Sequence, residues 1–518
     1  MIDMPTNLGF WNAAQAAPGT TAVIDAAGRS ITFGQLHGRS NQLVQGLREL
    51  GLQPGDAIAY LSENRGEIFE LFMAAAQAGW FITPINTHLA PAEVAYILED
   101  CGAKACFLSA RCAHLGLQSL QRLKEPPRAF SFDNYPEPLE PYTDLGEEAS
   151  TAPPERRSAG SPMTYTSGTT GQPKGVRRPW FEASPEQVYS QQALFLSLFG
   201  MPPGSEHRHL VVAPLYHTAV INFASNHLHL GHTVVLMDKW TPEACLEAIQ
   251  NHRITTSHMV PTMFSRLLKL PAEVRDRFDV SSCEVMIHGA APCPIEVKQD
   301  MLDWWGDCIY EYYAASEGGG TLATPAQWRD KPGTVGAPWP ISTLRILDDD
   351  HQPLPVGEAG TVWIRMGEHR FDYHGDEAKT EEAWNEGFFT VGDCGYLDED
   401  GFLFLCDRKV DMIISGGVNI YPAEIESCLI THPDVLDVAV FGIPDEDWGE
   451  AVMAVVETAA AADHEQALRA WCEDRLAKYK QPRHYRFTEA LPRDPNGKLY
   501  KRRLREPYWV GRNRGGAD

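Results

Sequence analysis

Buried-strand segments alternate with amphipathic helical segments in the first part of the chain, and this alternation limits the possible folds most strongly. Ala57–Leu61 and Phe81–Pro84 are short apolar runs typical of central strands. Apolar residues at helical spacing predict helices over Phe33–Leu50, Ile68–Gly79 and Pro91–Cys101. Strands and helices in this order favour a parallel α/β sheet.

The alternation pauses at Asn134–Pro162, where prolines, acidic residues, Ser and Ala predict a surface loop. It then resumes, with further central strands predicted at Leu210–Ala213, Val234–Met237, Val285–His288 and Cys308–Tyr312. From Lys331 to Leu405 the chain changes to short β-like runs separated by Gly, Asp and Pro. This pattern of short strands and turns predicts a small antiparallel barrel.

The segment beyond Asp407–Asp411 is about the size of a small independent domain. It carries predicted strands near Val435–Phe441 and Ala451–Glu457 and a predicted helix near Glu465–Tyr479. A chain of 518 residues is too long for one hydrophobic core. We therefore predict an α/β fold with a large N-terminal domain of α/β sheets plus a small β-barrel, residues 1–408. A small mobile α+β C-terminal domain, residues 409–518, follows it.

Charge and cysteine usage exclude some classes of protein. A formal net charge of −25 argues against a nucleic-acid binder, because such a surface repels phosphate backbones. The 11 cysteines form no C-x-x-C pair, which favours reduced thiols over a disulfide framework. No basic segment followed by an apolar run opens the chain, and no apolar stretch approaches the roughly 20 residues that span a membrane. We predict a cytoplasmic protein without a transmembrane segment. The sequence leaves open whether the chain forms a homodimer.

The stretch Thr164–Gly175 combines glycines, hydroxyl side chains and a lysine in one loop. Glycine lets backbone N–H groups converge on an anion, while the hydroxyls and Lys174 add donors and charge. A flexible linker would also be rich in Gly, Ser and Thr. However, a linker has no need of Tyr165, Pro173 and Lys174 at fixed places among the glycines, so the loop suits a polyphosphate.

The loop does not match the Walker pattern, but it resembles the phosphate-binding signature of the adenylate-forming enzymes. These are the acyl-CoA synthetases, the luciferases and the adenylation domains of peptide synthetases. The resemblance implies that the ATP phosphates are bound by Thr166, Ser167, Gly168, Thr169, Thr170, Gly171 and Lys174.

Four further blocks of the large domain follow in the order of that family. His217 lies in Ala213–Ala219, where the family has a histidine between the nucleotide and acyl sites, although a core histidine is an equal alternative from the residue alone. The small side chains at Gly289, Ala290 and Ala291 would let adenine lie against the backbone. The resemblance also implies that Tyr313 stacks on adenine and that Ser316 hydrogen-bonds near the α-phosphate. Glu317, with Thr169, would hold Mg²⁺. Asp393 would bind the ribose hydroxyls, and Arg408 would contact ribose and phosphate.

The block Asp407–Glu426 resembles the hinge of the same family, with the pivot at Lys409–Val410. Relatives commonly carry a charged residue where this chain has Val410. Beyond the pivot, Ser415, Gly416 and Gly417 would let the pantetheine arm of CoA pass close to the backbone. Pro492–Lys498 matches the loop that carries the catalytic lysine, so the resemblance makes Lys498 catalytic alongside His217 and Glu317.

Together these residues describe a carboxylate–CoA ligase of the AMP-forming type. ATP and Mg²⁺ would convert a carboxylic acid into an acyl-adenylate and pyrophosphate, and CoA would then take the acyl group and release AMP. Three consecutive glycines, Gly318, Gly319 and Gly320, together with apolar Val260–Phe264, predict room for a hydrophobic acid of medium or long chain, or a bulky cyclic acid.

Other functions remain open from the sequence. The enzyme could load a carrier-protein thiol or stop at acyl-AMP, and free CoA consumption would distinguish these cases. A luciferase-type oxygenase shares the fold and would emit light. A non-catalytic nucleotide sensor would bind ATP without pyrophosphate exchange, and the presence of Glu317 and Lys498 disfavours it.

Overall fold

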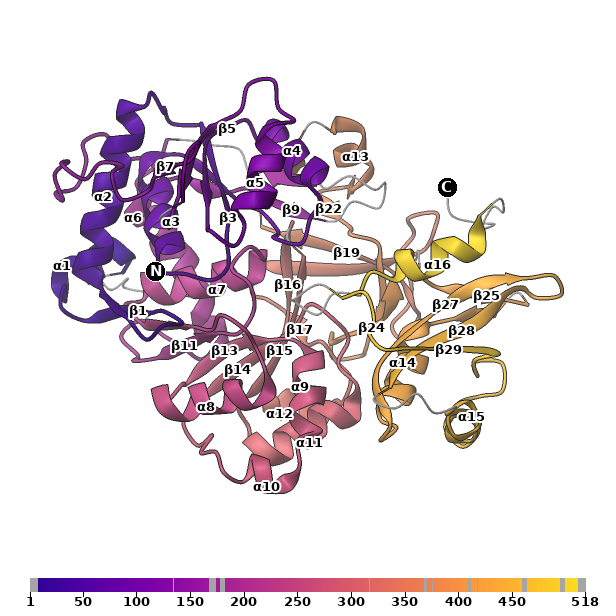
Figure 1. Cartoon of the computed structure of the whole chain (residues 1–518). Helices are drawn as coiled ribbons and strands as arrows, with labels where there is room; N and C mark the ends of the chain where they lie inside the picture. The colour runs from indigo at the N-terminus through magenta and orange to yellow at the C-terminus, as the bar shows by residue number, and fades with distance from the viewer. Residues whose placement is uncertain are drawn as a thin grey trace. The chain divides into compact units, whose positions relative to one another are not determined.

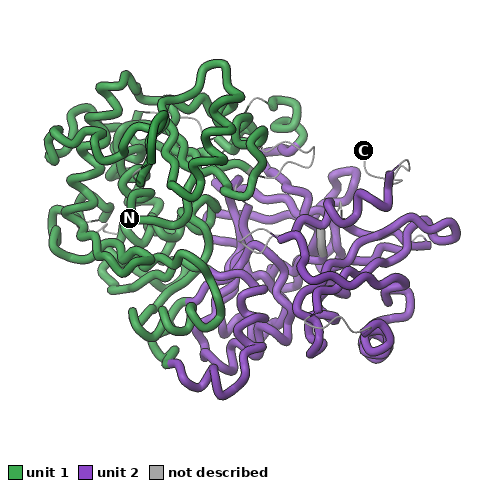
Figure 2. Tube along the Cα trace, in the orientation of Figure 1, with its two compact units in different colours: residues 1–258, 279–285, 369–382 green, residues 259–278, 286–368, 383–518 purple. Residues whose placement is uncertain are grey.

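A computed structural model describes residues 8–133, 135–166, 174–177, 182–315, 317–367, 370–374, 376–408, 411–416, 418–458, 464–493 and 499–510. Figure 1 shows the elements, and Figure 2 shows two compact units. Unit 1 comprises residues 1–258, 279–285 and 369–382, and unit 2 comprises residues 259–278, 286–368 and 383–518. The predicted boundary between residues 408 and 409 lies within unit 2. That residues 409–518 move as a separate domain therefore stays a prediction.

A parallel sheet with the strand order β7-β6-β5-β3-β4-β8 forms one part of unit 1, and the alternating pattern predicted its strands β3 and β4. The prediction of a surface loop over Asn134–Pro162 was wrong at two places, because β7 and β8 pair there with β6 and β4. The strands of this sheet are β3 (Ala57–Leu61), β4 (Phe81–Pro84), β5 (Ala103–Leu108), β6 (Arg128–Ser131), β7 (Glu140–Pro141) and β8 (Ser161–Pro162). The helices that alternate with them are α2 (Phe33–Glu49), α3 (Glu67–Ala78), α4 (Pro91–Asp100) and α5 (Ala113–Leu120). A capping box at Thr32 starts α2, and Gly79 ends α3 with a positive φ of 78°.

A second sheet of unit 1 has the order β13-β11-β12-β1-β2. It consists of β1 (Thr21–Ile24), β2 (Ser30–Thr32), β11 (Arg208–Val211), β12 (Thr233–Leu236) and β13 (Thr256–Met259). All neighbours are parallel except β1 and β2. The helices α7 (Thr218–His229) and α8 (Pro242–His252) follow β11 and β12 in the chain, which makes these segments βαβ units.

Three buried histidines on or next to β11, α7 and β12 form a chain of hydrogen bonds in which each donor and acceptor can be assigned. His232 Nε2 lies 2.9 Å from the Ser205 carbonyl oxygen, which can only accept, so a neutral His232 must accept at Nδ1. The Nδ1 of His227, 2.9 Å away, therefore donates. The Nε2 of His227 in turn accepts from the Thr256 hydroxyl at 3.3 Å, and His209 Nδ1 lies 2.9 Å from that hydroxyl. Protonation of His227 or His232 would remove an acceptor from this chain.

Acid is expected to destabilise unit 1 through these imidazoles. Burial lowers the pKa of His209 and of His229 to about 3 and that of His232 to about 4, from an ordinary value of about 6.5. The unfolded chain then binds more protons, so stability falls as the pH drops from about 6.5 towards 4, by up to about 1.4 kcal/mol per pH unit for each group. Urea unfolding at pH 7 and pH 5.5 measures this loss.

His229→Gln should reduce the pH dependence, because it removes one buried imidazole whose Nδ1 accepts the Phe10 N–H at 3.1 Å. His88→Gln is the matched control, since His88 is exposed. Equal pH dependence in the wild type and in His229→Gln would show that the buried imidazoles do not govern acid stability.

The first part of unit 2 continues the strand–helix pattern. The strands β14 (Val285–His288) and β15 (Ile309–Ala315) are parallel, and β16 (Gly318–Ala323) and β17 (Ala337–Pro338) add antiparallel neighbours. The helices of this part are α9 (Pro261–Leu268), α10 (Ala272–Arg275), α11 (Ile295–Trp305) and α12 (Pro325–Asp330). Lys298 and Val297 of α11 are buried, so one face of this helix belongs to the core.

Where the sequence predicts a small barrel, unit 2 contains an antiparallel sheet with the order β21-β22-β19-β23-β24, with β18 paired to β19. The strands are β18 (Ser342–Leu347), β19 (Gly360–Met366), β21 (Trp384–Asn385), β22 (Phe388–Phe389), β23 (Asp393–Leu397) and β24 (Leu403–Arg408). The predicted antiparallel pairing is therefore confirmed.

The C-terminal part has an α+β core of its own. A sheet of order β26-β25-β28-β27, extended by β29, contains β25 (Ile413–Ser415), β26 (Val418–Ile420), β27 (Val435–Asp445), β28 (Gly449–Thr458) and β29 (His484–Thr488). The helices α14 (Pro422–Ile430) and α15 (Glu465–Glu473) pack on it through Ile425, Leu429, Leu468 and Cys472. α15 ends at Glu473, earlier than the predicted Tyr479, because the backbone continues in turns up to Pro482. Across the described ranges, no helix is both long and apolar enough to cross a membrane.

Candidate functional site

A β-hairpin frames the predicted phosphate loop. β9 (Thr164–Thr166) and β10 (Lys174–Arg177) are antiparallel, and Thr166 is the register partner of Lys174. The two ends of the loop are therefore held opposite each other by backbone hydrogen bonds. The predicted phosphate ligands Ser167, Gly168, Thr169, Thr170 and Gly171 lie between them, outside the described residues.

The base of this hairpin is anchored by Tyr165 and Gly175. The Tyr165 hydroxyl donates a hydrogen bond to the Asp100 carboxylate at the end of α4, and burial is the main cause that raises the pKa of Tyr165. A Cβ atom on Gly175 would lie 2.6 Å from Met163 Cε and 3.0 Å from Tyr165 Cζ. Gly175 is therefore needed for the tyrosine to pack, whereas the sequence suggested only backbone freedom around an anion.

The loop that leads to His217 is held by Asn64, which follows β3. The Asn64 side chain donates to the carbonyl oxygens of Ala213 and Met237 at 3.0 Å and accepts from Leu215 N at 2.8 Å. The Tyr60 hydroxyl donates to the Leu215 carbonyl at 2.9 Å. His217 itself is half-buried, directly precedes α7, and has its ring 4.4 Å from that of Tyr216.

The predicted adenine-binding residues begin where β14 ends. A Cβ atom on Gly289 would lie 2.8 Å from the Tyr312 carbonyl oxygen, so only glycine permits the close approach of β15. Ala290 has a φ of 69°, in the left-handed region that costs an alanine about 1 kcal/mol. Ala290 is exposed and Ala291 is half-buried. The surrounding structure thus holds this turn in a conformation that alanine does not prefer.

Two predicted nucleotide ligands contact each other directly. The Tyr313 hydroxyl on β15 donates to Asp393 Oδ2 at the start of β23, over 2.7 Å. Arg408 is the register partner of Asp393 on the adjacent strand β24. Glu317 is half-buried in the turn that joins β15 to β16, and Ser316 lies outside the described residues. Residues far apart in the sequence therefore meet at one end of β15.

The three glycines after Glu317 do not leave empty space. A Cβ atom on Gly319 would lie 2.4 Å from Ile364 Cγ2, and one on Gly320 would lie 2.8 Å from the Trp339 ring. Gly318 faces Met366 in the same way, at 3.2 Å. Side chains from β19 and the loop after β17 fill the volume that the sequence assigned to a bulky acyl group. The prediction that these three glycines leave room for a bulky acyl group was therefore wrong.

Val260–Phe264, the other apolar segment invoked for the acyl pocket, belongs to the core. Phe264 is fully buried and packs with its ring edge against His288 at 5.3 Å. Val260 and Met263 are buried as well. These side chains support the sheet, so they do not by themselves indicate the substrate.

The predicted CoA-binding residues lie at the turn between β25 and β26. Ser415 pairs with Gly449 of β28, and Gly416 N–H donates to the Trp448 carbonyl at 2.8 Å. Gly416 has a φ of 58°, and a Cβ atom there would lie 2.6 Å from the Trp448 ring. The glycine therefore accommodates an indole, which sequence reasoning missed. Gly417, Lys498 and the hinge residues Lys409–Val410 lie outside the described residues.

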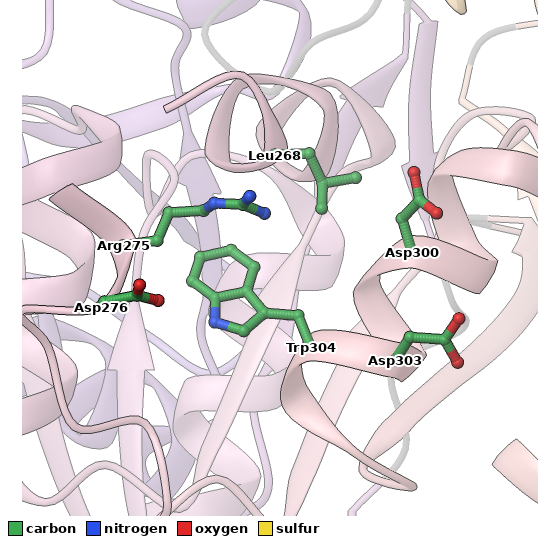
Figure 3. Close-up of a pocket in the computed structure, with 6 residues that line it drawn as sticks. All are labelled: Leu268, Arg275, Asp276, Asp300, Asp303 and Trp304. Carbon is green, nitrogen blue, oxygen red and sulfur yellow. The ribbon is translucent and has the colours of Figure 1, made fainter. Parts of the chain in front are cut away.

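Figure 3 shows a pocket of about 450 Å³ in unit 2. It is lined by Leu268, Arg275, Asp276, Asp300, Asp303 and Trp304 from α9, α10 and α11 and the residues next to them. The Arg275 guanidinium lies 5.1 Å from the centre of the Trp304 ring, which is a cation–π contact. None of the predicted site residues that the structure describes lines this pocket.

Comparison with known proteins supplies the family. Residues 10–369 match the model of the AMP-binding enzymes, and residues 424–498 match that of the AMP-binding enzyme C-terminal domain. The chain is 32% identical to the fatty acid–[acyl-carrier-protein] ligase ScoC of Streptomyces coeruleorubidus, over 96% of this chain and 95% of that protein. It is also 32% identical to the long-chain-fatty-acid–CoA ligase FadD13 of Mycobacterium tuberculosis, over 92% and 93% of the two chains.

A solved structure with the same fold is that of o-succinylbenzoate CoA synthetase from Bacillus subtilis, in complex with the acyl-adenylate intermediate OSB-AMP. It superposes with a TM-score of 0.80 at 27% identity and covers 96% of this chain and 97% of that one. The architecture of a large α/β part and a small C-terminal part is therefore shared along nearly the whole chain.

Proposed function

The chain belongs to the AMP-binding enzyme family, and from that premise we propose that it is an acyl-CoA synthetase. It is an acid–thiol ligase that forms an adenylate, as its relatives indicate. In the proposed reaction a hydrophobic carboxylic acid attacks the α-phosphate of ATP to give acyl-AMP and pyrophosphate. CoA then takes the acyl group and AMP leaves.

The observation that best supports this proposal is the grouping of Tyr313, Asp393 and the backbone of Arg408 at one end of β15. An ionised carboxylate can accept hydrogen bonds from two ribose hydroxyls while one of its oxygens stays oriented by the tyrosine. Tyr313 also offers an aromatic face to adenine. The turn at Gly289–Ala291 would contact the opposite face of the adenine ring.

The remaining roles follow from the chemistry of the two half-reactions. Lys498 would lie between the carboxylate and the α-phosphate and stabilise the charge that shifts between them. Among the described residues no cluster of three His, Cys, Asp or Glu could hold a metal. Mg²⁺ would be bound by Glu317 and Thr169 together with the phosphates of ATP, and it would neutralise phosphate charge.

Thioester formation would use the turn at Ser415–Gly417. We propose that residues 409–518 rotate about Lys409–Val410 between the two steps, a hinge motion that withdraws Lys498 and brings this turn to the adenylate. His217 would then separate the nucleotide and acyl sites. The proposal makes CoA the acceptor thiol, since FadD13 is a CoA ligase.

A medium-chain, long-chain or bulky cyclic acid is proposed as the substrate because two relatives act on fatty acids and the solved relative on o-succinylbenzoate. A carrier-protein thiol is the alternative acceptor, which ScoC favours. A panel of carboxylic acids, assayed for AMP release with CoA or with a phosphopantetheinylated carrier protein, tests both points.

We expect octanoate or a longer acid to be turned over with free CoA and acetate to be inactive. Equal turnover of acetate would contradict the proposed acid class. AMP release that requires the carrier protein and not CoA would establish the alternative acceptor.

A further inference from the structure

A buried ion pair joins α11 to β15 directly behind the predicted adenine-binding turn. Lys298 Nζ lies 2.6 Å from Glu311 Oε2, and the two side chains are 0% and 7% exposed. The Lys298 ammonium also lies 4.8 Å from the centre of the Trp328 ring of α12. Figure 1 shows α11 and α12 beside β15. Nothing in the proposed reaction uses these charges.

The Glu311 carboxylate lies beside the start of the turn from residue 289 to residue 294. His288 is its register partner on β14, and His288 Nε2 lies 3.5 Å from Glu311 Oε2. The turn then enters α11 at Ile295, and Lys298 is the fourth residue of that helix. The strand–turn–helix unit that contains Gly289, Ala290 and Ala291 consists of β14, the turn and α11. Through Lys298 and Glu311, its helix is bound to β15, the strand that pairs with β14.

The Glu311 carboxylate belongs to the same strand as Tyr313, the other residue predicted to contact adenine. Glu311 and Tyr313 are alternate residues of β15 and so lie on the same face of the sheet. The backbone between them carries Tyr312, whose carbonyl oxygen is the close neighbour of Gly289. Movement of Glu311 would therefore alter both the turn and the strand that presents Tyr313.

A buried ion pair is weak evidence of a contribution to stability. Burial lowers the pKa of Lys298 and raises the pKa of Glu311, and the charge of each partner opposes that shift. A buried pair of this kind is commonly no better than well-packed apolar side chains of the same volume. What the pair adds is a buried 2.6 Å contact between one residue of α11 and one residue of β15.

We propose that the Lys298–Glu311 ion pair is a positioning device for the base-binding turn, which sets the distance between Gly289–Ala291 and Tyr313 and thereby the affinity and base selectivity for ATP. This inference rests on the proposed function, in which these residues bind adenine. It predicts an effect on binding of the nucleotide and not on the chemical step.

The test uses Lys298→Met and the double variant Lys298→Met/Glu311→Gln in the full-length enzyme. Both should raise the KM for ATP in pyrophosphate exchange about tenfold while kcat changes less than twofold. Both should also lower the preference for ATP over purine riboside triphosphate, which lacks the 6-amino group. Fewer correctly folded molecules would reduce turnover with both nucleotides equally, so this ratio separates positioning from stability.

Lys331→Met is the control, because Lys331 forms its ion pairs with Asp398 and Asp400 of the same unit, which do not belong to the strand–turn–helix unit. It should leave the KM for ATP and the base preference unchanged. The double variant keeps the test informative if Lys298→Met fails to fold, since it leaves no buried charge unpaired. A double variant with wild-type KM and base preference would overturn the inference.

Failure of the proposed function would look different. In that case the wild-type protein would show no exchange with any acid, and ATP affinity would be measured by equilibrium dialysis instead. The variants would still be expected to bind ATP about tenfold more weakly than the wild type, and unchanged affinity would overturn the positioning role.

Discussion

Replacing Lys498 with alanine is expected to lower the rate of acyl-adenylate formation by about 100- to 1,000-fold, the usual cost of removing one group that stabilises transition-state charge. The lysine would contact the carboxylate and the α-phosphate only while the new acyl–phosphate bond forms. After rotation of the small domain it would be remote from the adenylate. The second half-reaction should therefore survive when acyl-AMP is supplied.

Single-turnover assays of the two half-reactions measure this difference. Lys480→Ala is the matched control, because Lys480 belongs to the same part of the chain and is bound to Glu424 at 2.7 Å. It should change neither rate. Equal loss of both half-reactions in Lys498→Ala would refute the role that the resemblance assigns to this residue.

Replacing Asp393 with alanine should raise the KM for ATP by at least about 100-fold, because each hydrogen bond to an ionised group contributes about 1.5–3 kcal/mol. Two such bonds to ribose would be lost, and the Tyr313 hydroxyl would lose its acceptor at 2.7 Å. Tyr313→Phe keeps the aromatic face for adenine and removes only that hydroxyl. It should raise the KM about fivefold, in line with about 1 kcal/mol for one hydrogen bond.

The double variant Asp393→Ala/Tyr313→Phe shows whether the hydroxyl acts through the carboxylate. If it does, Tyr313→Phe should have almost no further effect once Asp393 is gone, a non-additivity expected of residues in contact. Steady-state titration of ATP measures all three variants. An unchanged KM in Asp393→Ala would contradict the assignment of Asp393 to the ribose.

Much of the fold follows from local sequence signals. In the parallel sheet of unit 1, β3 and β4 were predicted because each is a short apolar run and because the helix between them, α3, ends at Gly79. The short strands β7 and β8 were missed, because Glu-Pro and Ser-Pro give no strand signal. The end of α15 was misplaced, because the apolar spacing continues up to Tyr479 while the backbone turns after Glu473.

The glycines show why the site was harder to predict. A sequence reveals that a side chain is missing and does not reveal which distant atom occupies the space. Gly319 faces Ile364, so the room assigned to a bulky acyl group there is taken by protein, and the missing side chain of Gly416 accommodates the Trp448 ring. Among the described residues, the Tyr313 hydroxyl and the Asp393 carboxylate are predicted nucleotide ligands whose side chains contact each other.

Supporting residues were missed for a related reason. Asn64 and Lys298 belong to no motif, and their partners are Leu215 and Glu311. A polar residue directly after the buried strand β3 was the one available signal for Asn64. For Lys298 a helical charge pattern would indicate a solvated face, and only the fold shows that this face is in the core.

Isotope exchange between labelled pyrophosphate and ATP tests the central claim most directly, because it requires formation and reversal of an acyl-adenylate and no acceptor thiol. We predict acid-dependent exchange with a hydrophobic carboxylic acid, abolished in Lys498→Ala and undiminished when CoA is omitted. Absence of exchange with every acid in a broad panel, with ATP and Mg²⁺ present, would contradict the account.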